Sequence, residues 1–186
     1  MGIKERKMSE PLKTFKHPAS LHPVKSTGAK VLLEIAGKVH QKVFIGNTVT
    51  EPIFFLSVYD GYIRKDDSKS VTIQFSEFDL TTLSVALSGY IEHKGVAEWE
   101  YKKFSGSSGD KRLYIGSSSG TFYLNFESPM AGRIAFPFNH IEGRALARII
   151  DRCLTETLDK SAEISWRSYE KQLRNSTTPT RTIPNR

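Results

Sequence analysis

The feature that most constrains the fold of this chain is an order of elements that occurs twice along the sequence. In each half, β-branched and aromatic residues gather in four short runs separated by turn-forming residues, which is typical of strands. The runs are 30–36, 42–45, 53–59 and 71–75 in the first half, then 97–104, 111–115, 121–127 and 133–138 in the second. A helical pattern follows each set. The sequence therefore predicts an α+β fold of two β-β-β-β-α repeats with antiparallel sheets.

The first helix is expected to begin at Ser76, where the hydrophobic period changes from that of a strand to that of a helix. Ser76 is a suitable N-cap, and Asp79 stands three residues later. Gly95 is expected to end this helix. Its apolar face is expected to comprise Leu80, Leu83, Leu87 and Tyr90.

The second helix is expected to begin at Asn139, with Glu142 completing a capping box. The same periodicity can continue through Trp166 and Tyr169 toward Leu173. Its apolar face is expected to comprise Ile141, Leu146, Ile149, Ile150, Cys153, Leu154 and Leu158.

The ends of the chain differ from the periodic region in composition. Residues 1–28 contain three prolines and scattered lysines without periodicity, so we expect a flexible basic arm. The domain is expected to span 29–160, with a helix extension over 161–174 and a disordered tail over 175–186. Deletion of 1–28 or of 175–186 is expected to leave the fold intact.

Positive charge is concentrated at the two ends. The net charge is +7, and residues 1–29 hold six Lys and Arg against two Glu. Residues 159–186 hold six against three acidic residues, which leaves the middle of the chain neutral. Basic ends commonly bind polyanions, although they also serve solubility alone.

Several classes of protein are not expected from the composition. A single cysteine, Cys153, gives no disulfide framework and favours a reducing compartment, the bacterial cytoplasm, with the mitochondrion as the alternative. No apolar run is long enough to span a membrane, and no secretory signal is recognised. The five histidines are scattered, and no phosphate-binding glycine motif occurs. We therefore expect no enzyme, no catalytic residue, no metal, no cofactor and no small-molecule substrate.

Two neighbouring strands of the second half carry the strongest candidate binding face. Side chains alternate along a strand, so Leu113 and Ile115 face one way and Arg112 and Tyr114 the other. In 121–127 the polar set comprises Thr121, Tyr123 and Asn125. Such a polar and aromatic surface can stack bases and contact phosphates. The alternative is an ordinary cross-strand tyrosine pair on a solvated face.

Further candidates come from the other strands and one turn. In 97–104, Tyr101 and Lys103 are expected to contact the ligand, whereas Trp99 is expected in the core or an interface. The first half adds Lys42, Phe44 and Tyr59 in strands and Arg64 and Lys65 in a turn.

Three stretches of the chain resemble the Whirly family and the related positive-cofactor-four single-stranded DNA-binding domain. They are VTIQFSEFDLTTLSVALSG (71–89), KRLYIGSSSGTFYLNF (111–126) and IAFPFNHIEGRALARII (134–150). The resemblance covers roughly 30–158 and implies curved sheets that stand like blades, with helices on one face. It also implies nucleic acid on the helix-free faces, often in a tetramer. The lysine-rich signature of the plant proteins is degenerate in TGAKVLL (27–33), which favours a bacterial or mobile-element relative.

The sequence and this resemblance together predict a sequence-tolerant single-stranded DNA-binding protein of replication, recombination or DNA transfer. An RNA-binding matchmaker of the same fold is one alternative, because stacking faces accept both nucleic acids. A β-rich structural or assembly protein is the other. A homo-oligomer, with a tetramer favoured, is expected because large aromatic residues and sheet edges need cover.

Overall fold

The computed structural model describes residues 13–27, 29–44, 47–61, 69–92, 99–103 and 109–176, with 44, 47 and 90–92 described by their backbone alone. The fold is α+β, with two four-stranded antiparallel sheets, each followed by a helix. The first sheet has the order β1-β2-β3-β4, and the second has the order β5-β6-β7-β8. The first set of elements is β1 (Lys13–Lys25), β2 (Val31–Phe44), β3 (Asn47–Asp60), β4 (Ser70–Phe75) and α1 (Glu77–Glu92). The second set is β5 (Glu100–Lys103), β6 (Lys111–Ser118), β7 (Thr121–Ser128), β8 (Gly132–Phe138) and α2 (His140–Ser176).

The first sheet corrects the sequence prediction in two places. The segment expected to be a flexible arm contains β1, which pairs with β2 from Lys13 to Lys25. The two runs expected as separate strands, 30–36 and 42–45, belong to the single strand β2 as far as Phe44. The first repeat thus has four strands. The first of them, β1, was not predicted from the sequence, and β2 was predicted as two separate strands.

Proline explains why β1 escaped notice. Pro18 and Pro23 lack the N–H that a central strand needs on both sides, but an edge strand tolerates them. Among the described strands, β1 lies at the edge of the first sheet and pairs with β2 alone. A register shift between Pro18 and Ser20 marks a β-bulge in it.

Side chains of α2 hold β1 in place from the inner side of the sheet. Ser20 Oγ lies 2.9 Å from Cys153 Sγ and 3.3 Å from Thr157 Oγ1. His22 Nε2 lies 2.8 Å from Glu156 Oε2. The segment 13–25 is therefore part of the folded body, and Cys153 is the buried thiol that its position on the apolar stripe predicted.

The second sheet follows the predicted strand order closely. β6 extends to Ser118, so Gly116 belongs to the strand, and the turn to β7 consists of Ser119 and Gly120. Both have positive φ, 50° and 82°, as a tight two-residue hairpin turn requires. β5 covers Glu100–Lys103 of the expected run 97–104, and residues 93–98 and 104–108, with Gly95, lie outside the described residues.

Both predicted helix starts are confirmed by their capping contacts. The amide of Asp79 donates to Ser76 Oγ at 3.2 Å, and the Ser76 amide donates to Asp79 Oδ2 at 3.4 Å. The amide of Glu142 donates to Asn139 Oδ1 at 3.0 Å, and the Asn139 amide returns a bond to Glu142 Oε2 at 2.8 Å. These pairs satisfy N–H groups that the first turn of a helix leaves without partners.

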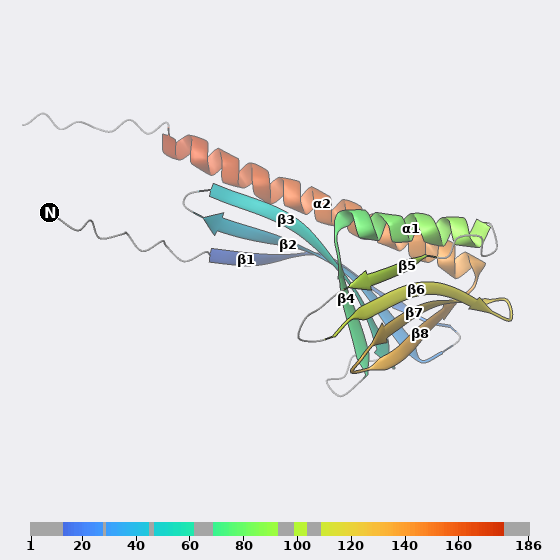
Figure 1. Cartoon of the computed structure of the whole chain (residues 1–186). Helices are drawn as coiled ribbons and strands as arrows, with labels where there is room; N and C mark the ends of the chain where they lie inside the picture. The colour runs from blue at the N-terminus through green and yellow to red at the C-terminus, as the bar shows by residue number, and fades with distance from the viewer. Residues whose placement is uncertain are drawn as a thin grey trace, which may run out of the picture.

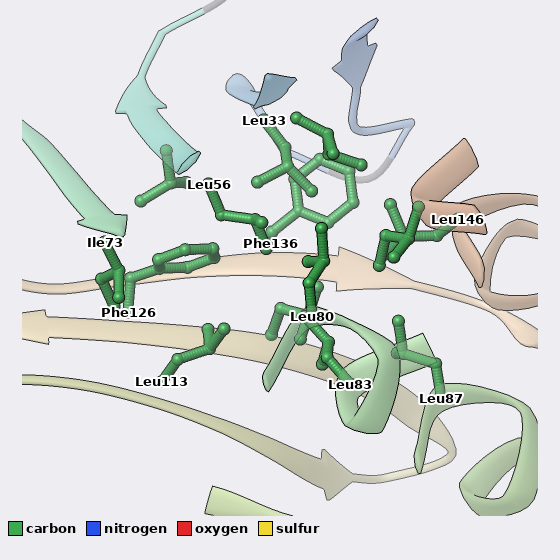
Figure 2. Packing of buried hydrophobic residues seen from close by; sticks show 14 of the residues in the cluster. Leu33, Leu56, Ile73, Leu80, Leu83, Leu87, Leu113, Phe126, Phe136 and Leu146 are labelled. Carbon is green, nitrogen blue, oxygen red and sulfur yellow. The ribbon is translucent and has the colours of Figure 1, made fainter. Parts of the chain in front are cut away.

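The two sheets and the two helices share one hydrophobic core. Figure 2 shows Leu33, Leu56 and Ile73 of the first sheet near Phe126, Phe136 and Leu113 of the second, with helix leucines beside them. The helix residues Leu80, Leu83 and Leu87 are fully buried, as predicted. Ile141 is the exception on α2, because it lies in the first turn and is 80% exposed.

α2 is much longer than α1 and runs along the first sheet beyond the end of α1 (Figure 1). α1 contacts the N-terminal half of α2, where Ser84 Oγ donates to Asp151 Oδ1 at 2.6 Å. In the C-terminal half, Trp166, Tyr169 and Leu173 are exposed. Neither helix of the described residues combines the length and apolar character needed to cross a bilayer.

Candidate nucleic-acid interface

The face of the second sheet that points away from the helices carries the five residues predicted from β6 and β7. Residues paired across antiparallel strands project to the same side. Tyr114 pairs with Asn125, and Gly116 pairs with Tyr123. The alternate residues Leu113 and Phe126 are fully buried in the core. We call this helix-free side the outer face of the second sheet; its predicted members are Arg112, Tyr114, Thr121, Tyr123 and Asn125.

Tyr114 is held by charged neighbours on both sides. Its hydroxyl donates to Glu127 Oε1 at 2.9 Å, and the guanidinium carbon of Arg112 lies 4.5 Å from its ring centroid. Arg112 also contacts Glu100 and lies 3.5 Å from Glu127 Oε2. The pKa of Tyr114 is raised, first by burial and then by the hydrogen bond to Glu127 and its negative charge. A guanidinium group thus lies over this ring, and guanidinium groups also stack on bases.

Asn125 lies on the predicted face but is only 1% exposed, so it offers almost no surface to a ligand in this structure. The reason is Arg133 of β8, which donates to Asn125 Oδ1 from Nε at 3.0 Å and from Nη2 at 2.6 Å. Asn125 therefore fixes an exposed guanidinium, which also lies 5.9 Å from the Tyr114 ring. Arg133 was missed, although the alternation of 133–138 places it on this side.

Tyr123 is the ring on this face with the smallest neighbours. It pairs with Gly116 on one side, which has no side chain, and with Pro137 on the other. The side chain is half-buried, and Thr121 stands two residues before it on the same face. A flat base can approach such a ring without displacing a bulky side chain.

The structure places Tyr101 and Lys103 on the opposite side of the second sheet, so they do not share the outer face with the other candidates. Tyr101 pairs with the buried Leu113 and stacks on Phe75 at 4.6 Å between ring centroids. Its hydroxyl donates to the carbonyl oxygen of Gln74 at 3.3 Å, and burial raises its pKa. Lys103 pairs with Lys111 on the same inner side.

The outer positions of β5 belong instead to Glu100 and Lys102, which pair with Tyr114 and Arg112. Alternation alone does not say which of the two sets in 97–104 matches the polar side of β6. The pairing register between the strands decides it. Trp99 is partly buried against the core, as expected.

The outer face of the first sheet carries basic side chains on β1 and β2, which we call the cation row: Lys16, Lys38, His40 and Lys42. Lys42 pairs with Thr14 and binds Glu51 Oε2 at 2.8 Å. His40 pairs with Lys16, and Lys38 pairs with Pro18. Lys16 and Lys38 were missed as candidates, the first because its segment was expected to be an arm.

The remaining predicted residues of the first half divide into three cases. Tyr59 is buried, and its hydroxyl donates to Glu34 Oε2 at 3.1 Å, so its ring is not a free stacking surface. Phe44 pairs with Asn47 through the backbone, and its side chain is not described. Arg64 and Lys65 lie outside the described residues.

The positive charge of the cation row affects the pKa of His40. The pKa of His40 is lowered, first by burial and then by the charge of Lys16, with further lowering by Lys42 and Lys38. Glu51 opposes these effects. A positive field of this kind attracts anions.

Within the described residues, the acidic, histidine and cysteine side chains form no cluster of three that could hold a metal ion. The thiol of Cys153 has its pKa raised by burial, which is the opposite of what a nucleophile needs. Neither a protein-family model nor a curated protein matches the chain.

Proposed function

We propose that the protein binds single-stranded DNA on the outer face of the second sheet. The observation that carries the proposal is the combination of Tyr123, a ring with small neighbours, and two oriented guanidinium groups. Arg133 is fixed by Asn125, and the guanidinium of Arg112 lies over the Tyr114 ring. The rings and guanidinium planes supply stacking surfaces, and the charges supply phosphate contacts.

The physical chemistry of this face favours single strands over duplexes. A duplex keeps its bases stacked on one another, so a flat aromatic surface gains little from it. Unpaired bases of any sequence offer a π-face. The cation row of the first sheet, with Lys16, Lys38 and Lys42, supplies additional attraction for phosphates.

The element order supports membership of the Whirly-like proteins as part of this proposal, since both repeats consist of four strands and a helix. We also propose a homo-oligomer. The C-terminal half of α2 leaves Trp166 and Tyr169 exposed by 61% and 51%, far more than large aromatic residues usually are.

The proposal is tested by competition binding against a fluorescent oligo-dT. Unlabelled oligo-dT is expected to displace the probe at much lower concentration than a duplex of the same length. A single-stranded RNA of the same length is the second competitor, and stronger competition by RNA would shift the proposal to RNA. Equal competition by duplex and single strand would contradict it, because that result indicates adhesion by charge alone.

A further inference from the structure

The outer face of the first sheet contains a hollow of about 400 Å³. The hollow lies where β2, β3 and β4 carry small residues at outward positions: Ala36, Ser57 and Thr72. Ala36 of β2 pairs with Phe55, Glu34 pairs with Ser57, and Ser57 pairs with Thr72 of β4. We call this site the Ala36 hollow; it is bordered by Pro18, Leu21, Glu34, Lys38, Phe55 and Tyr59.

The walls of the Ala36 hollow suit a flat ring. Phe55 is half-buried, and the Lys38 ammonium nitrogen lies 5.2 Å from its ring centroid. On the β1 side, the bulge between Pro18 and Ser20 interrupts the pairing, and Leu21 is 60% exposed. An apolar wall with a cation at its rim is a suitable environment for a nucleobase that carries a phosphate.

The charged acceptor among the residues that border the hollow is the Glu34 carboxylate. Tyr59 donates to Glu34 Oε2 at 3.1 Å and so fixes its orientation. A carboxylate has about four acceptor positions, so the bond from Tyr59 leaves capacity for a ligand. Ser57 and Thr72 are occupied with each other at 2.8 Å. The hollow therefore presents a fixed acceptor to whatever ring enters it.

We propose that the Ala36 hollow accepts one guanine base of a bound single strand. Guanine is the base whose Watson–Crick edge presents two adjacent N–H donors, which match the two oxygens of a carboxylate in a bidentate pair. Thymine offers a single N–H between two carbonyl oxygens, which a carboxylate repels. The Lys38 ammonium at the rim, with His40 and Lys42 beyond it along β2, lies where the phosphates of the same strand would run.

This inference rests on the proposed function and refines it, because binding is otherwise tolerant of sequence but prefers guanine at one position. The test compares oligo-dT with the same oligo-dT carrying one dG in its centre, both titrated into the full chain. A homopolymer background lets the strand shift its register until the dG reaches the hollow. The dG strand is expected to bind roughly tenfold more tightly, as a bidentate pair to a base edge gives.

Two changes identify the interaction responsible. Deoxyinosine in place of dG lacks the exocyclic amine and is expected to lose most of the gain. Glu34→Gln replaces one carboxylate oxygen by a donor and is expected to bring the ratio of the two affinities close to one. Glu51→Gln is the control, because it changes another carboxylate on the outer face of the first sheet. It is expected to leave the ratio of the two affinities as in the wild type. Thermal unfolding of both variants checks that each is folded.

The outcomes separate this inference from the proposed function. Tight binding of oligo-dT with no gain from dG would overturn the guanine site and leave the proposed function standing. A gain from dG that survives Glu34→Gln would also overturn it. Guanosine 5′-monophosphate is added as a free competitor. If it bound one-to-one while the dG strand showed no gain, the hollow would be a mononucleotide site and the proposal for a strand would be wrong.

Discussion

Gly37 and Thr157 are so close that no side chain fits between them. A Cβ atom placed on Gly37 would lie 1.8 Å from Thr157 Oγ1 and 2.9 Å from Ser20 Oγ. Gly37 is therefore required by the approach of α2 to β2, whereas its sequence context suggested the end of a strand. It marks the point where the helix, β2 and β1 meet.

Gly37→Ala is expected to destabilise the protein by about 1–3 kcal/mol, the usual cost of overpacking a dense site. Thr157→Ala in the same chain is expected to recover part of this loss, because it removes the nearest atom. Chemical denaturation of the wild type, both single variants and the double variant measures the coupling. Additive effects would show that the two positions do not meet as described.

Deletion of the first 25 residues is expected to destabilise the fold, contrary to the expectation from the sequence alone. The deletion removes β1, with its pairing to β2 and the contacts of Ser20 and His22 to α2. It also exposes the long edge of β2. Deletion of residues 1–12 leaves β1 present and serves as the control. Equal melting of the two truncated chains would show that β1 contributes nothing.

Much of the fold could be predicted because local signals agreed with it. Ser76, Asn139 and Glu142 are capping residues by chemistry alone, and alternation in 111–115 and 121–127 separates core from surface. The rest depends on contacts distant in sequence. Gly37 reads as a turn unless α2 is known to pass over it, and Pro18 reads as a loop unless its strand is known to be an edge. The side of the sheet on which Tyr101 lies depends on the register with β6.

The candidate site, like the fold, could be predicted from the sequence only in part. Which residues share a face followed from the two-residue period, so Tyr114 and Tyr123 were placed together correctly. Which of them is accessible did not follow, because that depends on cross-strand neighbours. Asn125 is covered by Arg133, and Tyr114 carries Arg112, whereas Tyr123 has Gly116 beside it.

The pKa of His40 is expected to rise when a single strand binds. In the free protein it is lowered by burial and by Lys16, so the neutral form is favoured, and protonation costs stability as the pH falls through the lowered pKa. Phosphates beside Lys16, Lys38 and Lys42 would offset that field. Binding is then coupled to the uptake of a proton by His40. The affinity therefore increases as the pH falls from the His40 pKa of the complex to that of the free protein.

The measurement is an NMR titration of the histidine ring protons with and without oligo-dT. His22, which contacts Glu156 on the inner side of the first sheet, is the internal control. A His40 pKa that does not move on saturation would mean that the strand avoids the outer face of the first sheet.

The assembly state is expected to be a homo-oligomer, with a tetramer favoured, formed through the C-terminal half of α2. Trp166→Glu combined with Tyr169→Glu is expected to reduce the mass measured by light scattering, because charge replaces the exposed apolar surface. A wild-type particle of 21.0 kDa at micromolar concentration would contradict this expectation.

Binding on the outer face of the second sheet is tested most directly by oligo-dT affinity in two matched aromatic variants. Tyr123→Ala removes the ring on the outer face of the second sheet, and Phe78→Ala removes an exposed ring on α1. We expect a loss of about 1–3 kcal/mol for Tyr123→Ala, the usual cost of one lost base stack, and unchanged affinity for Phe78→Ala. Unchanged affinity for Tyr123→Ala, or an equal loss in both variants, would contradict binding on this face.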